Sequence, residues 1–362
     1  MRIGIFTYHR SLNCGAVLQA WALMTFLRKL GFAAEIVNYG CIGRPVPYTL
    51  SFTSLREFVR SIYYDIRRMM GGESLRRCRY DAFLRQFVNL GIEVSREQLA
   101  NAVYSHVITG SDQVWHPIIN EGDSTYYLSF ADTSVKRISY AASFGVDWLP
   151  DDVRVMAECE LQKFFAISVR EPAGAGLVKR LCNRSADVVC DPTLLLDVDD
   201  YVPFEKTIAN LPKSYVLAYL IGSHPWALKF AQKVARENNI ALVCLQGGKM
   251  VEWMPFKKMV DISTSGPSEF LSAIHHASYV VTNSFHGTAF SLIYRRPFAV
   301  ALNANAGDER MRNIAQKVGL SHRLVECLNQ KIPLCHEDWA VVDDGLANER
   351  MHAMDFLKRA LM

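Results

Sequence analysis

The sequence predicts an α/β protein with parallel sheets, and three observations support this fold class. Residues 2–7 are an apolar run typical of a buried strand, residues 15–30 carry apolar side chains at helical spacing, and residues 33–39 are again strand-like. Strand-helix-strand units of this kind build parallel sheets. The pattern recurs along the chain, and 362 residues exceed what one core usually supports. Two domains are therefore expected.

Two series of strands follow. In the first, strands are expected at 103–109, 136–141, 166–169 and 188–189, and polar residues follow each of them, where open α/β sheets bind ligands. In the second, strands at 215–221, 240–245 and 279–282 alternate with helices near 226–238 and 268–276. The pattern loosens between the two, which places a domain boundary near residue 205 and predicts domains of 1–205 and 206–362. The tail at 348–362 is helical by spacing and could pack on either domain, including back on the N-terminal one.

Composition excludes several classes of protein. Forty basic and 36 acidic residues give a net charge of +4, too mild to indicate nucleic-acid binding. The nine cysteines contain no CxxC pair, so neither a disulfide framework nor a zinc site is indicated and a reducing cytosol fits best. The start of the chain lacks the features of a signal peptide, and no apolar run approaches the roughly 20 residues of a membrane span. We expect a cytoplasmic protein, at most attached to a membrane surface.

The basic residues are concentrated between residues 55 and 79, which carry seven arginines against three acidic residues. Apolar residues at steps of three and four predict an amphipathic helix at 55–70. Such a helix is ordinarily a charged, solvated face over a packed stripe. The alternative is a surface helix that meets anionic lipid, as a peripheral membrane contact.

The stretch TNSFHGTAFSLIYRRP, which begins at Thr282, places polar residues between a strand and a helix. Ser284, Gly287 and Thr288 stand where unpaired backbone N–H groups and the helix dipole favour an anion. His286 is the side chain best suited to exchange a proton near neutral pH, although a histidine here could simply cap the helix. The chain contains neither GxGxxG nor GxxxxGK[ST], which disfavours nicotinamide cofactors and P-loop chemistry.

Two arginines are candidates for holding an anion. Arg170 follows a short apolar strand, and a guanidinium there can bind a carboxylate or phosphate through two parallel hydrogen bonds. A salt bridge to Glu171 or Asp191 is the structural alternative. Arg310 opens a predicted helix and could face the same crevice, or it could be a surface arginine.

The stretch GSDQVW combines hydrogen-bonding groups with an aromatic plane, a mixture typical of carbohydrate sites. It provides Ser111, Asp112, Gln113 and Trp115, although a lone tryptophan is more often part of the core. Asp191, in DPT, can simply initiate a turn or cap a helix.

Taken in order, several segments resemble the polysaccharide pyruvyl transferase family. They are NCGAVLQAWAL from Asn13, VITGSDQVWHP from Val107, SYAASFG from Ser139, VRE from Val169, CDPTLLL from Cys190 and TNSFHGTAFSLIYRRPF from Thr282. The resemblance implies two Rossmann-like domains facing a cleft, as in B-type glycosyltransferases. It also implies transfer of a pyruvyl group from phosphoenolpyruvate to a sugar of a capsule or exopolysaccharide precursor, as a cyclic ketal, with release of phosphate.

The resemblance implies that Arg170 and His286 belong to the phosphoenolpyruvate site and that Arg310 is a recurrent arginine, whereas the acceptor residues and Asp112 are expected from their own chemistry. Catalysis is assigned to His286, Arg170 and Asp112. Donor binding is assigned to Arg170, Ser284, His286, Gly287, Thr288 and Arg310. Acceptor binding is assigned to Asn13, Gly15, Gln19, Ser111, Asp112, Gln113, Trp115 and Ser143.

The expected partners are phosphoenolpyruvate, as a co-substrate, and a lipid-linked or nucleotide-linked saccharide, handled on the cytosolic side of an envelope without a metal or other cofactor. The sequence specifies neither the sugar nor the oligomeric state. Two other functions stay open: a glycosyltransferase that uses a nucleotide sugar in the same cleft, and a non-catalytic saccharide-binding subunit.

Overall fold

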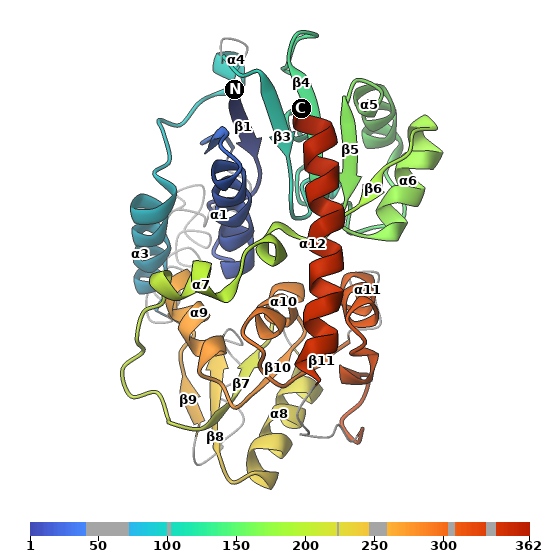
Figure 1. Ribbon diagram of the computed structural model, residues 1–362. Helices are drawn as coiled ribbons and strands as arrows, with labels where there is room; N and C mark the ends of the chain where they lie inside the picture. Colours follow the sequence, from blue (N-terminus) through green and yellow to red (C-terminus); the bar gives the residue numbers. More distant parts are fainter. Residues whose placement is uncertain (41–71, 100–102, 223, 246–258, 303–307, 331–337) are drawn as a thin grey trace, which may run out of the picture.

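The chain folds into two parallel sheets of six strands each, shown in a computed structural model (Figure 1). The structure describes residues 1–40, 72–99, 103–222, 224–245, 259–302, 308–330 and 338–362. The first sheet has the order β2-β1-β3-β4-β5-β6 and the second the order β12-β11-β10-β7-β8-β9, and every strand pair in them is parallel. The α/β class with parallel sheets is confirmed.

The first half of the chain forms the first sheet and the helices around it. Its strands are β1 (Arg2–Phe6), β2 (Ala33–Ile36), β3 (His106–Thr109), β4 (Lys136–Ala142), β5 (Ala166–Val169) and β6 (Asp187–Val188). Its helices are α1 (Cys14–Lys29), α3 (Glu73–Phe83), the π-helical turn η1 (Leu84–Val88), α4 (Arg96–Leu99), α5 (Asp151–Leu161), α6 (Pro172–Cys182), the short turn η3 (Pro192–Leu195) and α7 (Val198–Tyr201).

The second half contributes the second sheet. Its strands are β7 (Tyr215–Tyr219), β8 (Ala241–Leu245), β9 (Met259–Asp261), β10 (Tyr279–Thr282), β11 (Phe298–Ala301) and β12 (Leu324–Val325). Its helices are α8 (Pro225–Glu237), α9 (Pro267–His275), α10 (Phe285–Ile293), α11 (Glu309–Lys317) and α12 (Trp339–Leu361). The proposed boundary near residue 205 falls between the last strand of the first sheet and the first strand of the second.

Helix α1 shows how local sequence sets an element that later carries the site. The Asn13 side chain accepts hydrogen bonds from the backbone N–H groups of Gly15 and Ala16, at 2.9 and 3.4 Å, and so begins the helix. Gly31 has a φ of 88°, which ends it. Almost every side chain between these ends is buried, because the helix contacts the first sheet, η3 and α9 at once.

Helix α12 spans both halves of the molecule, as Figure 1 shows. Nearer its start, Glu349 pairs with Lys317 of α11 at 2.6 Å. Nearer its end, Arg359 pairs with Asp187 of β6 at 3.0 Å. The helix begins nine residues before the predicted position, at Trp339. The helix therefore packs on both halves. The prediction for the tail at 348–362 left packing on either domain open.

The strand orders put two ligand-binding edges opposite each other. In the second sheet the order corresponds to the doubly wound arrangement, with its topological switch point between β7 and β10. In the first sheet the order reverses between β1 and β3. Ligands in such sheets bind beyond the carboxyl ends of the strands at the switch point. The topology therefore predicts a ligand site at the loops after β1, β3 and β10.

Candidate functional site

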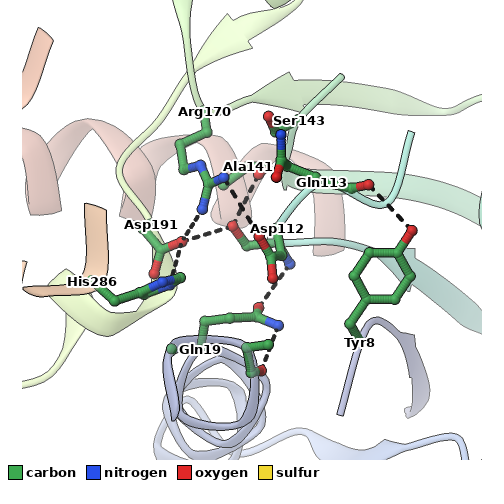
Figure 2. A network of polar contacts seen from close by, with 12 residues as sticks. Tyr8, Gln19, Asp112, Gln113, Ala141, Ser143, Arg170, Asp191 and His286 are labelled. Atoms are coloured by element: carbon green, nitrogen blue, oxygen red, sulfur yellow. Dashed lines mark hydrogen bonds and ion pairs between the residues drawn. The ribbon is translucent and has the colours of Figure 1, made fainter. Parts of the chain in front are cut away.

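The polar residues that follow the strands of the first sheet meet the start of α10 from the second half (Figure 2). Asp112 follows β3, Arg170 follows β5, Asp191 follows β6, and His286 lies in the first turn of α10. The strand ends of the first sheet and the start of α10 are far apart in sequence, and both Asp191 and Gly15 link the first half to His286. The site is thus assembled from both halves of the molecule.

Asp191 is the centre of this network and has no solvent exposure. One carboxylate oxygen, Oδ1, accepts hydrogen bonds from the backbone N–H and the hydroxyl of Thr193, at 3.0 and 2.8 Å. The other, Oδ2, lies 3.0 Å from Nη1 of Arg170, 2.9 Å from the Ser111 hydroxyl that donates to it, and 3.8 Å from Nε2 of His286. Burial opposes ionisation of this carboxyl, yet His286, Arg170 and Thr193 lower its pKa below the ordinary aspartate value.

Arg170 lies near three carboxylates but forms a hydrogen bond with only one of them, Asp191. Besides Asp191, its guanidinium lies 3.6 Å from Asp112 and 3.9 Å from Glu171, and these charges raise its pKa although burial works against them. Its side chain is 2% exposed, and neither Nε nor Nη2 has a hydrogen-bond acceptor among the residues that the structure describes. The guanidinium also lies over the ring of Phe285, at 4.9 Å. Two buried donors thus remain for something other than the protein.

His286 is packed against the other half of the molecule. A Cβ atom at Gly15 would lie 2.0 Å from Nδ1 of His286, so only glycine fits at this position of α1 while the imidazole stays in place. Burial lowers the pKa of His286, Arg170 and Arg310 lower it further, and Asp191 and Asp112 oppose the change. The imidazole is therefore neutral at pH 7 in the free protein, with Nε2 directed to Asp191.

Ser111 and Asp112 are held by a second layer of hydrogen bonds. The Gln19 side chain of α1 accepts from the backbone N–H of Ser111 at 3.1 Å and donates to the Thr7 hydroxyl at 2.8 Å. The Ser111 hydroxyl is shared between Asp191 and the carbonyl of Ala141. Gln19 and Ser111 are both fully buried, so they position other groups and offer no atom to a substrate.

Arg310 approaches the same cluster from α11. Burial and the neighbouring Arg170 lower its pKa to about 10, whereas Glu171 and Asp112 oppose the shift. Together with Glu171, it lines a small cavity of about 30 Å³ at the meeting of the two halves. The prediction that Arg310 faces the crevice agrees with this position.

Glu171 is buried beside Arg170, and Ser143 holds it. The Ser143 hydroxyl donates to Oε1 at 2.5 Å, whereas Oε2 has no hydrogen-bond partner within the described part of the chain. Ser143 therefore acts here on a neighbouring carboxylate, and its predicted contact with an acceptor has no support in the geometry.

The predicted anion turn at the start of α10 is present, but its side chains are occupied. The Thr288 hydroxyl donates to the Ser284 carbonyl at 3.1 Å, and the Ser284 N–H donates to Thr282. Gly287 lies so close to Thr282 and Tyr219 that a Cβ atom would clash with both. What this turn can offer an anion is the backbone and the helix dipole.

The prediction that Trp115 stacks on a sugar is wrong. Its indole is fully buried, stacks on Tyr127 at 5.5 Å and donates a hydrogen bond to the Tyr126 carbonyl. It belongs to the core of the first half. Gln113, its neighbour, is partly exposed and lies against Gly145, near the small cavity beside Arg310.

Sequence comparison agrees with the motifs that meet in this site. The family described as polysaccharide pyruvyl transferase matches residues 13–305, which is most of the chain. The chain belongs to this family. No curated protein matches the chain by sequence.

Solved structures that resemble this member of the pyruvyl transferase family share its fold at low identity. A putative UDP-N-acetylglucosamine 2-epimerase from Listeria monocytogenes is 10% identical, with 99% of this chain and 89% of that one covered and a TM-score of 0.50. The UDP-GlcNAc 2-epimerase of Methanocaldococcus jannaschii is 13% identical, with 99% and 100% covered and a TM-score of 0.49. The E. coli ADP-heptose lps heptosyltransferase II is 9% identical, with 99% of each chain covered and a TM-score of 0.41. The two parallel six-stranded sheets confirm the predicted pair of Rossmann-like units, and the Listeria structure has the same overall fold.

Asp191 and Glu171 are the site residues that sequence reasoning undervalued in this pyruvyl transferase family member. The DPT motif by itself predicted that Asp191 initiates a turn or caps a helix. Asp191 does cap η3, through Oδ1, and its other oxygen, Oδ2, is left to contact Arg170 and Ser111. The signal was the charge pattern: acidic residues directly follow two neighbouring strand ends, and one of those ends also bears an arginine. The structural alternative for Arg170, a salt bridge to Glu171 or Asp191, is also observed.

The Arg-rich helix predicted at 55–70 lies outside the described residues. Three arginines that follow it lie on or beside α3 and bind within the protein: Arg76 donates to the Leu12 carbonyl, Arg77 pairs with Glu73, and Arg79 donates to the Thr264 carbonyl of the second half. Among the described helices, none is both long and apolar enough to cross a bilayer.

One cluster of described residues has side chains of the kind that bind metal ions. The described residues include one group with three metal-type ligand atoms within 4.8 Å of one another, Glu205, His275 and His276. It lies near Tyr294, at the opposite end of α10 from His286. The prediction that catalysis needs no metal remains a prediction.

Proposed function

We propose that the protein transfers the pyruvyl group of phosphoenolpyruvate to two hydroxyl groups of a saccharide, forms a cyclic ketal and releases phosphate. The observation that supports this most is the buried guanidinium of Arg170, close to His286 and Arg310, in which two donors have no hydrogen-bond acceptor among the described residues. Phosphoenolpyruvate carries a carboxylate and a phosphate, and planar guanidinium groups bind both through paired hydrogen bonds. The backbone at the start of α10 adds N–H donors on the same side.

Charge balance explains why the free site is poised to take up a proton. Two arginines face three carboxylates, those of Asp112, Glu171 and Asp191, and His286 is neutral. A bound phosphoenolpyruvate adds further negative charge, which favours the protonated imidazole. Donor binding therefore places a proton on His286, where the reaction needs it.

The ketal then forms in balanced steps. His286 delivers a proton to the methylene carbon of the donor, which becomes a methyl group and leaves an oxocarbenium-like centre at the adjacent carbon. A first saccharide hydroxyl adds there and loses its proton. Phosphate leaves with its bonding electrons, and the second hydroxyl adds in its place and releases a second proton. One hydroxyl proton replaces the proton lost by His286, and the other leaves with phosphate.

Asp112 is the proposed base for the hydroxyl groups. It follows β3 at the switch point of the first sheet, is partly exposed, and lies 3.6 Å from Arg170. Asp191 is a positioning residue in this scheme, because its oxygens are occupied by Thr193, Ser111 and Arg170. It orients both Arg170 and His286 and stabilises the imidazolium. The acceptor is a lipid-linked or nucleotide-linked saccharide on the cytosolic side of an envelope.

The experiment is to incubate the purified protein with phosphoenolpyruvate and a panel of lipid-linked, nucleotide-linked and simple glycosides, and to measure phosphate release and acceptor mass. We expect one acceptor to gain the mass of a pyruvyl ketal, and His286→Ala to lower the rate by roughly 100-fold or more. Separate calorimetry measures phosphoenolpyruvate binding to the same protein.

Two results would overturn the proposal. Tight binding of a nucleotide sugar with no binding of phosphoenolpyruvate would indicate a glycosyltransferase. Saccharide binding that survives both His286→Ala and Arg170→Ala, with no turnover by the wild type, would indicate a non-catalytic subunit.

A further inference from the structure

A cavity of about 540 Å³ lies beside the site, between one face of α3 and η1 and the loop that follows β1. Arg77, Tyr80, Asp81, Leu84 and Arg85 form the helical wall. They recur at steps of three and four, so they share one face of the helix. The π-helical turn η1 keeps Leu84 and Arg85 on this face at its end. The volume is that of an ordinary small-molecule site.

The opposite wall connects the cavity to the catalytic centre. Arg10 and Leu12 line it from the loop after β1, and Asn13 next to them caps α1, whose Gly15 touches His286. The floor is connected too, because the hydroxyl of Tyr80 lies 2.8 Å from Sγ of Cys14, the first residue of α1. The wall of the cavity therefore continues through Asn13 into the first turn of α1, which contacts the imidazole.

The strand order of the first sheet locates the cavity relative to the catalytic centre. The centre lies among Asp112 after β3, Arg170 after β5 and Asp191 after β6. The cavity flanks the end of β1, on the side of β3 away from β5, whereas Arg310 approaches from the side of Glu171. The proposed donor site and the cavity therefore lie by different strands of the first sheet.

The chemistry of the lining favours a phosphate-bearing ligand. Three guanidinium groups, those of Arg10, Arg77 and Arg85, face the cavity with one carboxylate, Asp81. Each guanidinium is anchored within the protein: Arg77 pairs with Glu73 through Nε and Nη2, at 3.1 and 2.5 Å, Arg85 donates from Nε to the Asp81 carbonyl at 3.2 Å, and Nη1 of Arg10 lies 3.5 Å from Glu93. Such anchoring reduces the entropy lost when a phosphate binds several of them. Leucines and Tyr80 add apolar surface.

We propose that this cavity binds the diphosphate that links the acceptor saccharide to its carrier, and so presents the sugar hydroxyls to His286 and Asp112. This rests on the proposed function, because the bound acceptor receives the pyruvyl group. The carrier can be a nucleotide or a polyprenyl lipid, since both attach sugars through a diphosphate. The proposal gives Arg77, near the end of the Arg-rich stretch, and Arg85, just beyond it, a ligand-binding role that neither a solvated face nor a lipid-binding helix supplies.

The test is calorimetric titration of inorganic pyrophosphate into the full-length protein and into Arg77→Gln and Arg85→Gln. Each substitution should weaken pyrophosphate binding by about tenfold or more, because a hydrogen-bonded charge is lost. Arg154→Gln, an exposed α5 arginine paired with Glu158 on the same helix, is the matched control and should bind as the wild type does. Leu90→Trp keeps every charge but fills the cavity, and should also weaken binding.

Other outcomes separate this proposal from the first. Pyrophosphate binding that survives the double variant Arg77→Gln/Arg85→Gln, or that disappears only in Arg170→Gln, would overturn the cavity as its site. Absence of phosphoenolpyruvate binding, with arginine-dependent pyrophosphate binding intact, would overturn the donor assignment alone. Competition by UDP or by farnesyl diphosphate then assigns the carrier as nucleotide or lipid, and either result supports the diphosphate subsite.

Discussion

Two buried arginines on neighbouring strands of the first sheet differ in how completely the protein satisfies them. Arg137 of β4 donates to Glu160 of α5 at 2.8 Å and to the carbonyl of Ala131. Arg170, directly after β5, faces three carboxylates, yet Nε and Nη2 find no acceptor among the described residues. Buried donors are normally bonded, so an arginine left with unused donors at a strand end indicates a place kept for a ligand. Arg137 instead ties a helix to the sheet.

Replacing each arginine by lysine breaks this comparison most directly. Lysine retains the charge but loses the fork of donors. We expect Arg170→Lys to weaken phosphoenolpyruvate binding by roughly 100-fold, because paired hydrogen bonds to the donor are lost. Arg137→Lys should leave that affinity unchanged and lower the free energy of unfolding by about 1–3 kcal/mol. Calorimetry and urea unfolding measure the two effects. Equal donor affinities in both variants would contradict the distinction.

The contact between Gly15 and His286 gives the next largest effect. A methyl group at Gly15 would displace the imidazole, since its Cβ would lie 2.0 Å from Nδ1. Gly15→Ala should slow turnover by about 100-fold, comparable to loss of the histidine. Because alanine is a good helix former, α1 itself should persist.

The matching control is the double variant. In His286→Ala the space is already empty, so adding Gly15→Ala should slow turnover no further. If the effects of the two substitutions on the turnover rate multiply instead, Gly15 influences turnover by a route other than its contact with His286.

Arg310 and Arg312, on the same helix, extend the comparison to the second half. Arg310 is half-buried beside the acidic cluster, whereas Arg312 is exposed and pairs with Glu326 at 2.7 Å. Arg310→Gln should raise the KM for phosphoenolpyruvate about tenfold, as expected for one lost hydrogen bond to a charged group. Arg312→Gln should leave KM as it is. A shift of the same size in both variants would remove Arg310 from the donor site.

The smallest effect concerns pH. Because the folded protein lowers the pKa of His286, the unfolded chain binds the proton more tightly. Stability from this residue is full above the unfolded pKa of about 6.5 and is lost as pH falls below it, by at most about 1.4 kcal/mol per pH unit. Between pH 7 and 5.5, the free energy of unfolding of the wild type should fall by more than that of His286→Gln in urea unfolding. Parallel losses would mean that folding does not lower the pKa of the imidazole.

Most of the fold could be predicted from the chain because its information is local. The apolar runs, the Asn13 cap and Gly31 define β1, α1 and β2 to within a few residues, and β5 and β10 have the predicted bounds. Strands β9, β11 and β12 were not predicted, since each has only two to four residues and carries little periodicity. The motif order placed Arg170, Asp112 and His286 in one site. In the structure Arg170 and His286 meet at Asp191, and Asp112 lies 3.6 Å from Arg170.

The sequence by itself determined which residues carry chemistry at strand ends, because side-chain type and position along a strand are local properties. Only the tertiary structure decided which of them are available. Trp115, Gln19 and Ser111 look like ligand-binding residues in the sequence, but packing buries them completely. Asp191 looks like a simple cap, but three neighbours from distant segments converge on its second oxygen. Burial and convergence depend on contacts between segments tens to hundreds of residues apart, and no local pattern records those contacts.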